Sequence, residues 1–243
     1  MQSKQLYSIS EIFNKSMDFF KANYEYLVPY TIFYLFLSVI VSYTPIKSIS
    51  IVMQILMIPL GFAVPYFIDS VNRGEEKSFL KFFQVYKALI PYLGAKLFGM
   101  LVAIICLMPL FFSVYNLLNE FQFDVNLLIN EIQNGRVELP SSSKIKIAVS
   151  LFLMISTLPF YIFLEYFMIL SKDTFETALK KSYHIGIRYY VQIIVLFISA
   201  FILMFIGFAT CFFGLIVAIP LIYSMFYFSY NQLKNDFPTY KEA

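Results

Sequence analysis

Two ionisable residues stand inside apolar runs of this sequence and are its best candidates for chemistry. Glu165 interrupts the run from Phe160 to Met168, and Lys96 lies within a second apolar run. If both runs cross a membrane, each charge lies roughly 10–14 Å deep from the same side, at about 1.5 Å of helix rise per residue. A charge at that depth is costly without a partner or a wet cavity. The pattern predicts a proton-, ion- or headgroup-binding site; the alternatives are a structural ion pair and a Lys96 side chain that snorkels to the interface.

No other pattern in the sequence is typical of catalysis. The motifs Gly-x-Ser-x-Gly, His-Glu-x-x-His and Cys-x-x-Cys are absent, as is a phosphate-binding glycine-rich loop. The only histidine, His184, falls on the charged face of a predicted amphipathic helix, where we expect it to be solvated. Cys106 and Cys211 lie in apolar runs and are expected to pack as small apolar residues. We therefore expect no enzyme activity, no metal site and no cofactor.

The composition is that of an all-α polytopic membrane protein. Hydrophobic residues make up 60% of the 243 residues, charged residues only 14%, and the mean hydropathy is +0.73. A soluble domain has about 25% charged residues. The net charge of +3 gives no indication of nucleic-acid binding.

Six apolar segments predict six membrane spans. The first four cover approximately residues 26–43, 51–71, 90–117 and 147–170. The uncharged stretch Tyr189–Leu233 would far exceed a bilayer core of about 30 Å as one helix, so it predicts two spans with a turn within Gly207–Gly214. Pro59, Gly61 and Pro65 predict a kink or break in the second span.

Amphipathic segments are predicted on the cytoplasmic surface before spans one, three and five. The first opens on a capping box, Ser8 to Glu11, the second begins near Phe79, and the third covers residues 173–188. Their cations are candidates for contacts with anionic lipid headgroups. These cations are Lys15, Lys21, Lys81, Lys87, Lys180, Lys181 and Arg188.

The whole chain, residues 1–243, is predicted to be a single membrane domain with a weak internal repeat. The repeat units would be residues 8–71, 77–171 and 173–233, each an amphipathic segment followed by two spans. A phenylalanine and two lysines recur with the same spacing in the first two units, as Phe13, Lys15 and Lys21, then Phe79, Lys81 and Lys87. Chance matches in so biased a composition are the alternative.

The distribution of positive charge predicts the orientation of the chain. Thirteen of the 18 lysine and arginine residues lie in the connections on the side of the N-terminus, and Lys96 lies within a span. The remaining four are Lys47, Arg136, Lys144 and Lys146. The positive-inside rule therefore predicts that both ends are cytoplasmic.

Tyrosine is expected to replace tryptophan at the membrane interfaces, because tryptophan is absent. The tyrosines near predicted span ends are Tyr24, Tyr26, Tyr43, Tyr92, Tyr189, Tyr190 and Tyr230.

The second half of the chain resembles a bacterial family of integral membrane proteins with six helices. The resemblance rests on Ile169-Leu-Ser-Lys-Asp173, Ala178-Leu-Lys-Lys-Ser182, Gly214-Leu-Ile-Val-Ala-Ile-Pro220 and Tyr230. The family is similar to the membrane domain fused to some glycerophosphodiester phosphodiesterases. The resemblance implies a bacterial inner-membrane protein of the same helical plan. It implies no phosphodiesterase activity, because this sequence lacks the catalytic domain of the fused relatives.

Two functions are compatible with these features. The first is a non-catalytic membrane protein that binds lipids or a partner protein in envelope homeostasis. The alternative is a small transporter or channel that uses Lys96 and Glu165.

Overall fold

A computed structural model describes residues 8–120, 141–210 and 213–236, and every element in these ranges is a helix. The elements are α1 (Ile9–Tyr43), α2 (Lys47–Met57), η1 (Pro59–Phe62), α3 (Ala63–Asn72), η2 (Phe79–Ala88), α4 (Leu89–Glu120), α6 (Ser141–Tyr161), α7 (Leu164–Ile169), α8 (Phe175–Arg188), α9 (Tyr190–Ala209), α10 (Leu215–Leu233) and η3 (Lys234–Asp236). The predicted all-α class is confirmed for this part of the chain.

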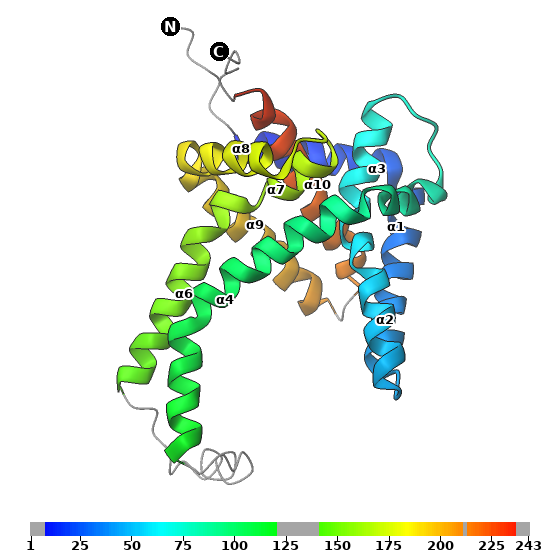
Figure 1. The fold of residues 1–243 in the computed structure, drawn as a ribbon. Coiled ribbons are helices and arrows are strands. Elements are labelled where there is room, and N and C mark those ends of the chain that lie inside the picture. The colour runs from blue at the N-terminus through cyan, green and yellow to red at the C-terminus, as the bar shows by residue number, and fades with distance from the viewer. Residues whose placement is uncertain (1–7, 121–140, 211–212, 237–243) are drawn as a thin grey trace, which may run out of the picture.

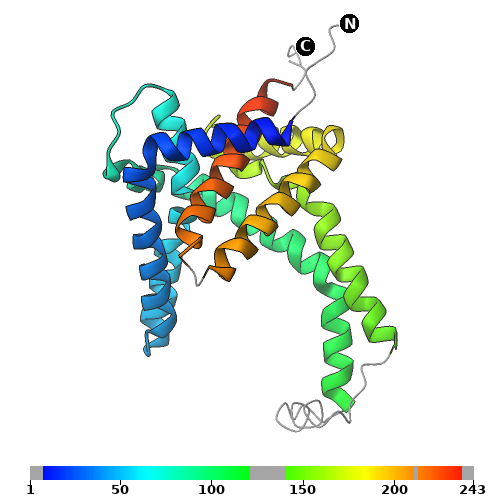
Figure 2. The same cartoon turned by 180° about the vertical axis from the view of Figure 1, so that it is seen from behind.

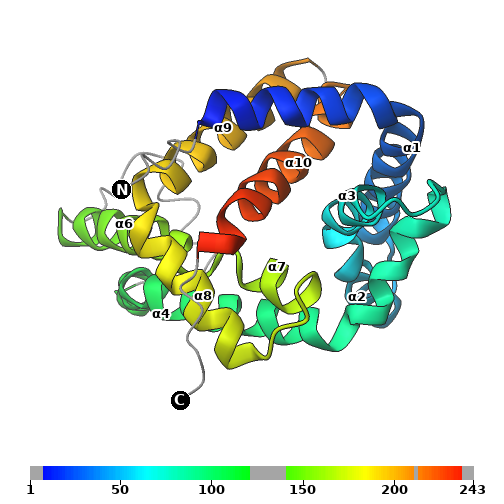
Figure 3. The same ribbon diagram turned by 90° about the horizontal axis from the view of Figure 1, so that it is seen from above.

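The helices form hairpins that hang from one end of the molecule. The pairs α1–α2 and α4–α6 diverge as two long legs, and the shorter pair α9–α10 lies between them (Figures 1 and 2). The first part of α1, together with α7 and α8, lies across that same end. Seen from above that end, α10 runs through the middle of a ring of other helices (Figure 3). We call the end with α7 and α8 the capped end and the opposite end the open end.

Helix α1 changes direction at Asn23. Ser8 caps its first turn, because the Ser8 side chain accepts a hydrogen bond from the Glu11 N–H at 3.4 Å, while the Glu11 carboxylate pairs with Lys15. Asn23 is buried and has non-helical dihedral angles (φ −137°, ψ 16°), and its side chain donates to the carbonyl of Phe19 at 2.8 Å. Residues before Asn23 lie across the capped end, and those after it form a leg (Figure 2).

The predicted break in the second span is confirmed. The chain runs from α2 through the 3₁₀ helix η1 into α3, and Pro59 begins η1. Backbone carbonyls near such a break need other partners, because lipid supplies none. The Tyr86 hydroxyl donates to the carbonyl of Leu56 at 2.5 Å, and the Tyr30 hydroxyl donates to that of Leu60 at 2.6 Å. Tyrosines from η2 and α1 therefore hold the broken span in place.

Aromatic side chains fill the core beside this break. The predicted amphipathic helix near Phe79 is the 3₁₀ helix η2, and its Phe82 is fully buried. The ring of Phe82 stacks on Tyr30 at 4.0 Å and on Phe67 at 4.5 Å between centroids. Offset stacking of this kind adds to the apolar area that each ring buries.

Helix α8 lies against α6 through a glycine. A Cβ on Gly186 would meet the carbonyl oxygen of Pro159 at 2.6 Å and the Cα of Phe160 at 2.8 Å. The two backbones can approach this closely only because position 186 has no side chain. The buried residues of α8 are Ala178, Ser182, Ile185 and Gly186.

Helices α9 and α10 form a tight hairpin with its turn where the sequence predicts it. Helix α9 ends at Ala209 and α10 begins at Leu215. A Cβ on Gly207 would lie 2.9 Å from a Leu215 methyl group, and one on Gly214 would lie 2.8 Å from the Gly207 Cα. Both glycines therefore permit the close approach of the two helices.

Polar bonds join the legs α4 and α6. The Leu110 N–H, next to Pro109 in α4, donates to the hydroxyl of Ser150 at 3.0 Å. The buried Cys106 thiol lies 3.5 Å from the Thr157 hydroxyl. Cys106 thus packs as a small side chain, while Cys211 lies outside the described residues.

Five helical runs in the described residues are long and apolar enough to cross a membrane. They are Ile9–Tyr43, Lys47–Asn72, Phe79–Asn116, Lys144–Ile169 and Tyr190–Ala209. The sixth predicted span corresponds to α10, which is not among them. The second half of α10 carries serines, tyrosines, an asparagine and a glutamine, and buries much of this polar surface against the other helices.

Candidate functional site

A break in the fourth predicted span places Glu165 in a short helix that packs on α4. Helix α6 contains Pro159, whose missing N–H weakens the helix near its end at Tyr161. The chain turns at residues 162–163, and α7 then begins at Leu164 in a new direction (Figure 1). Glu165 lies in the first turn of α7, which packs on α4.

Glu165 and Lys96 form an ion pair. The Nζ of Lys96, on α4, lies 2.6 Å from Oε1 of Glu165. The Glu165 side chain is 22% exposed and that of Lys96 is 47% exposed, so the carboxylate is the more enclosed partner. The Lys96 ammonium also lies 5.2 Å from the centroid of the Tyr92 ring, within range of a cation–π contact. The two candidates that the sequence singles out therefore meet.

The pair lies on the wall of a cavity of about 960 Å³. The walls come from all three hairpins and from α7, and the lining includes Glu165 of α7 as well as Val41 and Ser42 near the end of α1. Most of its lining is apolar, including Met100, Ile162, Phe197, Met204, Ile219 and Ile222. A cavity of this volume is at the upper end of the usual range for ligand sites, about 300–1,000 Å³.

Three tyrosine hydroxyls converge on the cavity wall near Gly61. A Cβ on Gly61 would lie 3.4 Å from the hydroxyl of Tyr92, 3.9 Å from that of Tyr223 and 4.0 Å from that of Tyr34. We call Tyr34, Tyr92 and Tyr223 the tyrosine cluster. Within the described residues none of its hydroxyls has a hydrogen-bond partner in the protein, and all three residues line the cavity. A hydroxyl in an apolar cavity favours a ligand that can accept or donate a hydrogen bond.

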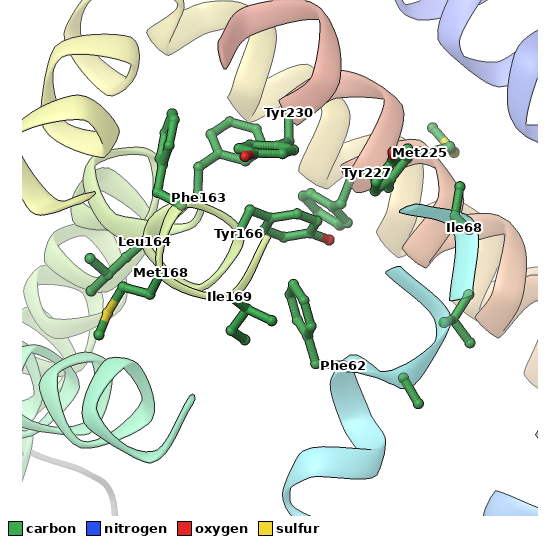
Figure 4. Close-up of a cluster of buried hydrophobic side chains, with 14 of the residues drawn as sticks. Phe62, Ile68, Phe163, Leu164, Tyr166, Met168, Ile169, Met225, Tyr227 and Tyr230 are labelled. Atoms are coloured by element: carbon green, nitrogen blue, oxygen red, sulfur yellow. The ribbon is translucent and has the colours of Figure 1, made fainter. Parts of the chain in front are cut away.

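Aromatic side chains from η1, α7 and α10 form a layer in the core (Figure 4), and two of them, Phe62 and Tyr166, line the cavity. The rings of Phe62 and Tyr166 meet edge to face at 4.8 Å, and Tyr166 contacts Tyr230 at 5.2 Å. The Tyr230 and Ser171 hydroxyls lie 2.5 Å apart. Next to them the hydroxyl of Tyr227 donates to Asp69 at 3.1 Å. Unlike the hydroxyls of the tyrosine cluster, those of Tyr227 and Tyr230 have hydrogen-bond partners within the protein.

Two of the tyrosines expected at the membrane interfaces are instead part of this core. Tyr92 and Tyr230 are each only 2% exposed, so the interfacial prediction is wrong for them. Tyr24 and Tyr43 are 60% and 83% exposed, as an interfacial role requires. Proximity to the end of a span does not show whether a ring faces lipid or the protein. The histidine expected to be solvated, His184, is half-buried.

Most of the predicted headgroup-binding cations are paired with acids of the same chain. Lys15 pairs with Glu11 at 2.6 Å, Lys81 with Glu75 at 2.6 Å, Lys180 with Glu176 at 2.5 Å and Lys181 with Asp173 at 2.8 Å. Lys21 and Lys87 are exposed and have no ion pair among the described residues. Arg188 lies over the ring of Tyr189, at 5.7 Å from its centroid.

The surface pairs shift the pKa values of their acids. The hydrogen bond from Lys81 lowers the pKa of Glu75, and the charges of Lys81 and Arg73 act in the same direction. The hydrogen bond from Lys180 likewise lowers the pKa of Glu176. Both shifts favour the ionised carboxylate and so strengthen the pairing of these lysines within the chain.

A second cavity, of about 430 Å³, lies between α4, α6 and α8. Half of its lining residues are aromatic, and Lys180 is the only charged residue in the described part of this lining. It contains no converging polar groups comparable to the tyrosine cluster. The larger cavity is therefore the candidate site.

Among the described residues, no group of three or more histidine, cysteine, aspartate or glutamate side chains is placed to hold a metal ion. No known protein family, curated protein or solved structure matches this chain. The resemblance to the bacterial six-helix family stays a prediction, and the function must be argued from the cavity itself.

Proposed function

We propose that this chain is a non-catalytic integral membrane protein that binds a lipid in the cavity between its hairpins. The observation that carries the proposal is the combination within one cavity of an apolar lining, the Lys96–Glu165 pair and the tyrosine cluster. Apolar walls fit acyl chains, and a small number of polar groups fit a headgroup. The proposed context is envelope homeostasis in the bacterial inner membrane.

The proposed topology has six spans, with α10 as the sixth. Helix α10 pairs with α9, whose composition is that of a membrane span, and it is long enough to cross most of a bilayer core at about 1.5 Å per residue. The excess of lysine and arginine on one side supports cytoplasmic ends. The capped end would then face the cytoplasm, with α8 and the first part of α1 on the membrane surface. A protein partner could bind the same surface.

A substitution that fills the cavity tests the proposal. Met204 on α9 lines the cavity, whereas its neighbour Phe205 points outward and is 68% exposed. We expect native mass spectrometry of the detergent-extracted protein to show bound lipid in the wild type and in Phe205→Trp. We expect Met204→Trp to lose that lipid while it remains folded. Equal lipid retention in all three proteins would overturn the proposal.

The second candidate function is transport, and the two broken spans favour it. The runs α2–η1–α3 and α6–α7 are both interrupted beside the cavity, and η1 and α7 contribute to its lining. Discontinuous helices around a central site are typical of secondary transporters. In proteoliposomes, solute or proton flux that is abolished by Glu165→Gln would support transport. Lipid retention without flux would support the binding function alone.

A further inference from the structure

The headgroup-binding part of the cavity contains one positive and one negative charge. Lys96 and Glu165 balance each other, and no other charged residue among those that the structure describes lines the cavity. A ligand that engages one partner of such a pair must leave the other with a compensating charge, since an unpaired charge in an apolar site is strongly destabilising.

This balance discriminates among classes of headgroup. An anionic headgroup would compensate Lys96 but would place a second negative charge beside Glu165. A cationic headgroup would leave Lys96 without a counter-charge. An uncharged headgroup would leave the ion pair intact and gain only neutral hydrogen bonds. A zwitterionic headgroup can exchange partners with the pair, and the site then contains no uncompensated charge.

The tyrosine cluster supplies hydrogen-bond donors beside the pair. The hydroxyls of Tyr34, Tyr92 and Tyr223 have no partner in the described part of the protein, and phosphate oxygens are strong acceptors. The ring of Tyr92, which already lies 5.2 Å from the Lys96 ammonium, presents an aromatic surface next to a cation.

We infer that the cavity selects a phospholipid with a zwitterionic headgroup, whose phosphate pairs with Lys96 and the tyrosine cluster and whose ammonium group pairs with Glu165. The inference rests on the lipid-binding function proposed above and specifies its ligand. The acyl chains lie along the apolar lining toward the open end, where Met204 and Ile219 contribute to the walls. The predicted preference for anionic lipids then concerns the surface lysines and not this site.

The test is competition among lipids that differ only in their headgroup. The full chain in detergent is incubated with equal amounts of dioleoyl phosphatidylethanolamine, dioleoyl phosphatidylglycerol and dioleoylglycerol, and bound lipid is measured by native mass spectrometry. We expect the amount of bound phosphatidylethanolamine to exceed that of each competitor by about tenfold. This is the factor in affinity that one hydrogen bond to a charged group supplies.

Two double variants identify the residues responsible. Lys96→Met/Glu165→Gln removes both charges, so neither is left unpaired, and it should stay folded but lose the headgroup preference. The matched control is Lys15→Met/Glu11→Gln, which removes an exposed Lys–Glu pair of the same 2.6 Å length and should keep the preference. Tyr223→Phe should reduce the preference without abolishing lipid binding.

The outcomes separate this inference from the function on which it rests. If lipid is retained and displaced by Met204→Trp, but phosphatidylglycerol or dioleoylglycerol binds as well as phosphatidylethanolamine, the inference is wrong and the binding function stands. A preference that survives in Lys96→Met/Glu165→Gln also overturns the inference. If no lipid of any class is retained, both fail.

Discussion

The capped and open ends of the molecule are built by different interactions. At the capped end the backbones of α6 and α8 touch at Gly186, and aromatic rings from η1, α7 and α10 interlock. At the open end no residue of α2 is buried, and Phe111 and Phe112 of α4 are 53% and 59% exposed. The legs α1–α2 and α4–α6 diverge there (Figure 1).

This difference explains why a cavity exists. Helices surrounded by lipid gain little from burying apolar side chains against one another, because acyl chains are equally apolar. Backbone breaks, hydroxyls and charges do require protein partners, and these features are concentrated near the capped end. The hairpins are therefore joined near the chain breaks and the central ion pair, and they diverge toward the open end. The Lys96–Glu165 pair lies between the two regions.

The largest effect on stability is expected from Gly186→Val, which disrupts the packing of α8 on α6 at the capped end. The added Cβ would lie 2.6 Å from the Pro159 carbonyl oxygen and 2.8 Å from the Phe160 Cα, and neither backbone atom can move without the rest of α6. We expect a loss of about 3 kcal/mol or more, the upper end of overpacking costs. Thermal unfolding in detergent and proteolysis of α8 would measure it.

Gly94→Ala is the control for this substitution. Its added Cβ meets only the flexible end of Met168, at 3.9 Å, so the variant should melt close to the wild type. If Gly186→Val also melts like the wild type, the contact between α8 and α6 does not hold the capped end.

The next largest effect is expected at the ion pair between the two regions. Lys96→Met leaves the carboxylate of Glu165, which is only 22% exposed, without its partner. We expect this to cost about 2 kcal/mol, less than the roughly 3–5 kcal/mol of a fully buried pair because Lys96 is 47% exposed. Lys96→Met/Glu165→Gln should be more stable than Lys96→Met alone, as a double-mutant cycle would show.

The exposed pair Lys15–Glu11 provides the comparison. Its side chains are 55% and 52% exposed, so Lys15→Met should change stability by less than about 1 kcal/mol. Additive effects of Lys96→Met and Glu165→Gln would mean that the central pair behaves like this surface pair.

The sequence predicts the apolar helices, the broken second span, the turn between α9 and α10 and the two charges of the site, because each depends on local composition. It does not predict the tyrosine cluster. Tyr34, Tyr92 and Tyr223 come from three different helices, and their hydroxyls meet only because those helices pack around Gly61. The break between α6 and α7 is also absent from the prediction. Pro159 marks it, but proline inside a membrane helix is tolerated too often to indicate a new helix direction.

A smaller effect is expected from Ser150→Ala in the leg α4–α6. The substitution removes the acceptor of the Leu110 N–H, which Pro109 places at an irregular point of α4. We expect a loss of about 1 kcal/mol, typical of a hydrogen bond between membrane helices. The control is Ser199→Ala, because the Ser199 hydroxyl donates only to the Val195 carbonyl of its own helix. Equal stability of the two variants would indicate that lipid contacts alone hold this leg together.

The smallest effect concerns Glu75, in the connection that follows α3. The hydrogen bond from Lys81 lowers its pKa, so between the lowered and the ordinary value the folded state binds fewer protons than the unfolded state. The resulting stabilisation is complete above the ordinary glutamate pKa of about 4.3 and is lost as the pH falls through the lowered value. The difference in melting temperature between wild type and Glu75→Gln should therefore shrink from about pH 6 to about pH 3, and also in high salt.

A difference that stays constant with pH would mean that Glu75 acts through its shape and not its charge. Because this pair lies in a connection outside the predicted spans and Glu75 also pairs with Arg73 at 3.4 Å, its effect should be below that of Lys96–Glu165, and a comparable effect would contradict the contrast between the connection and the cavity.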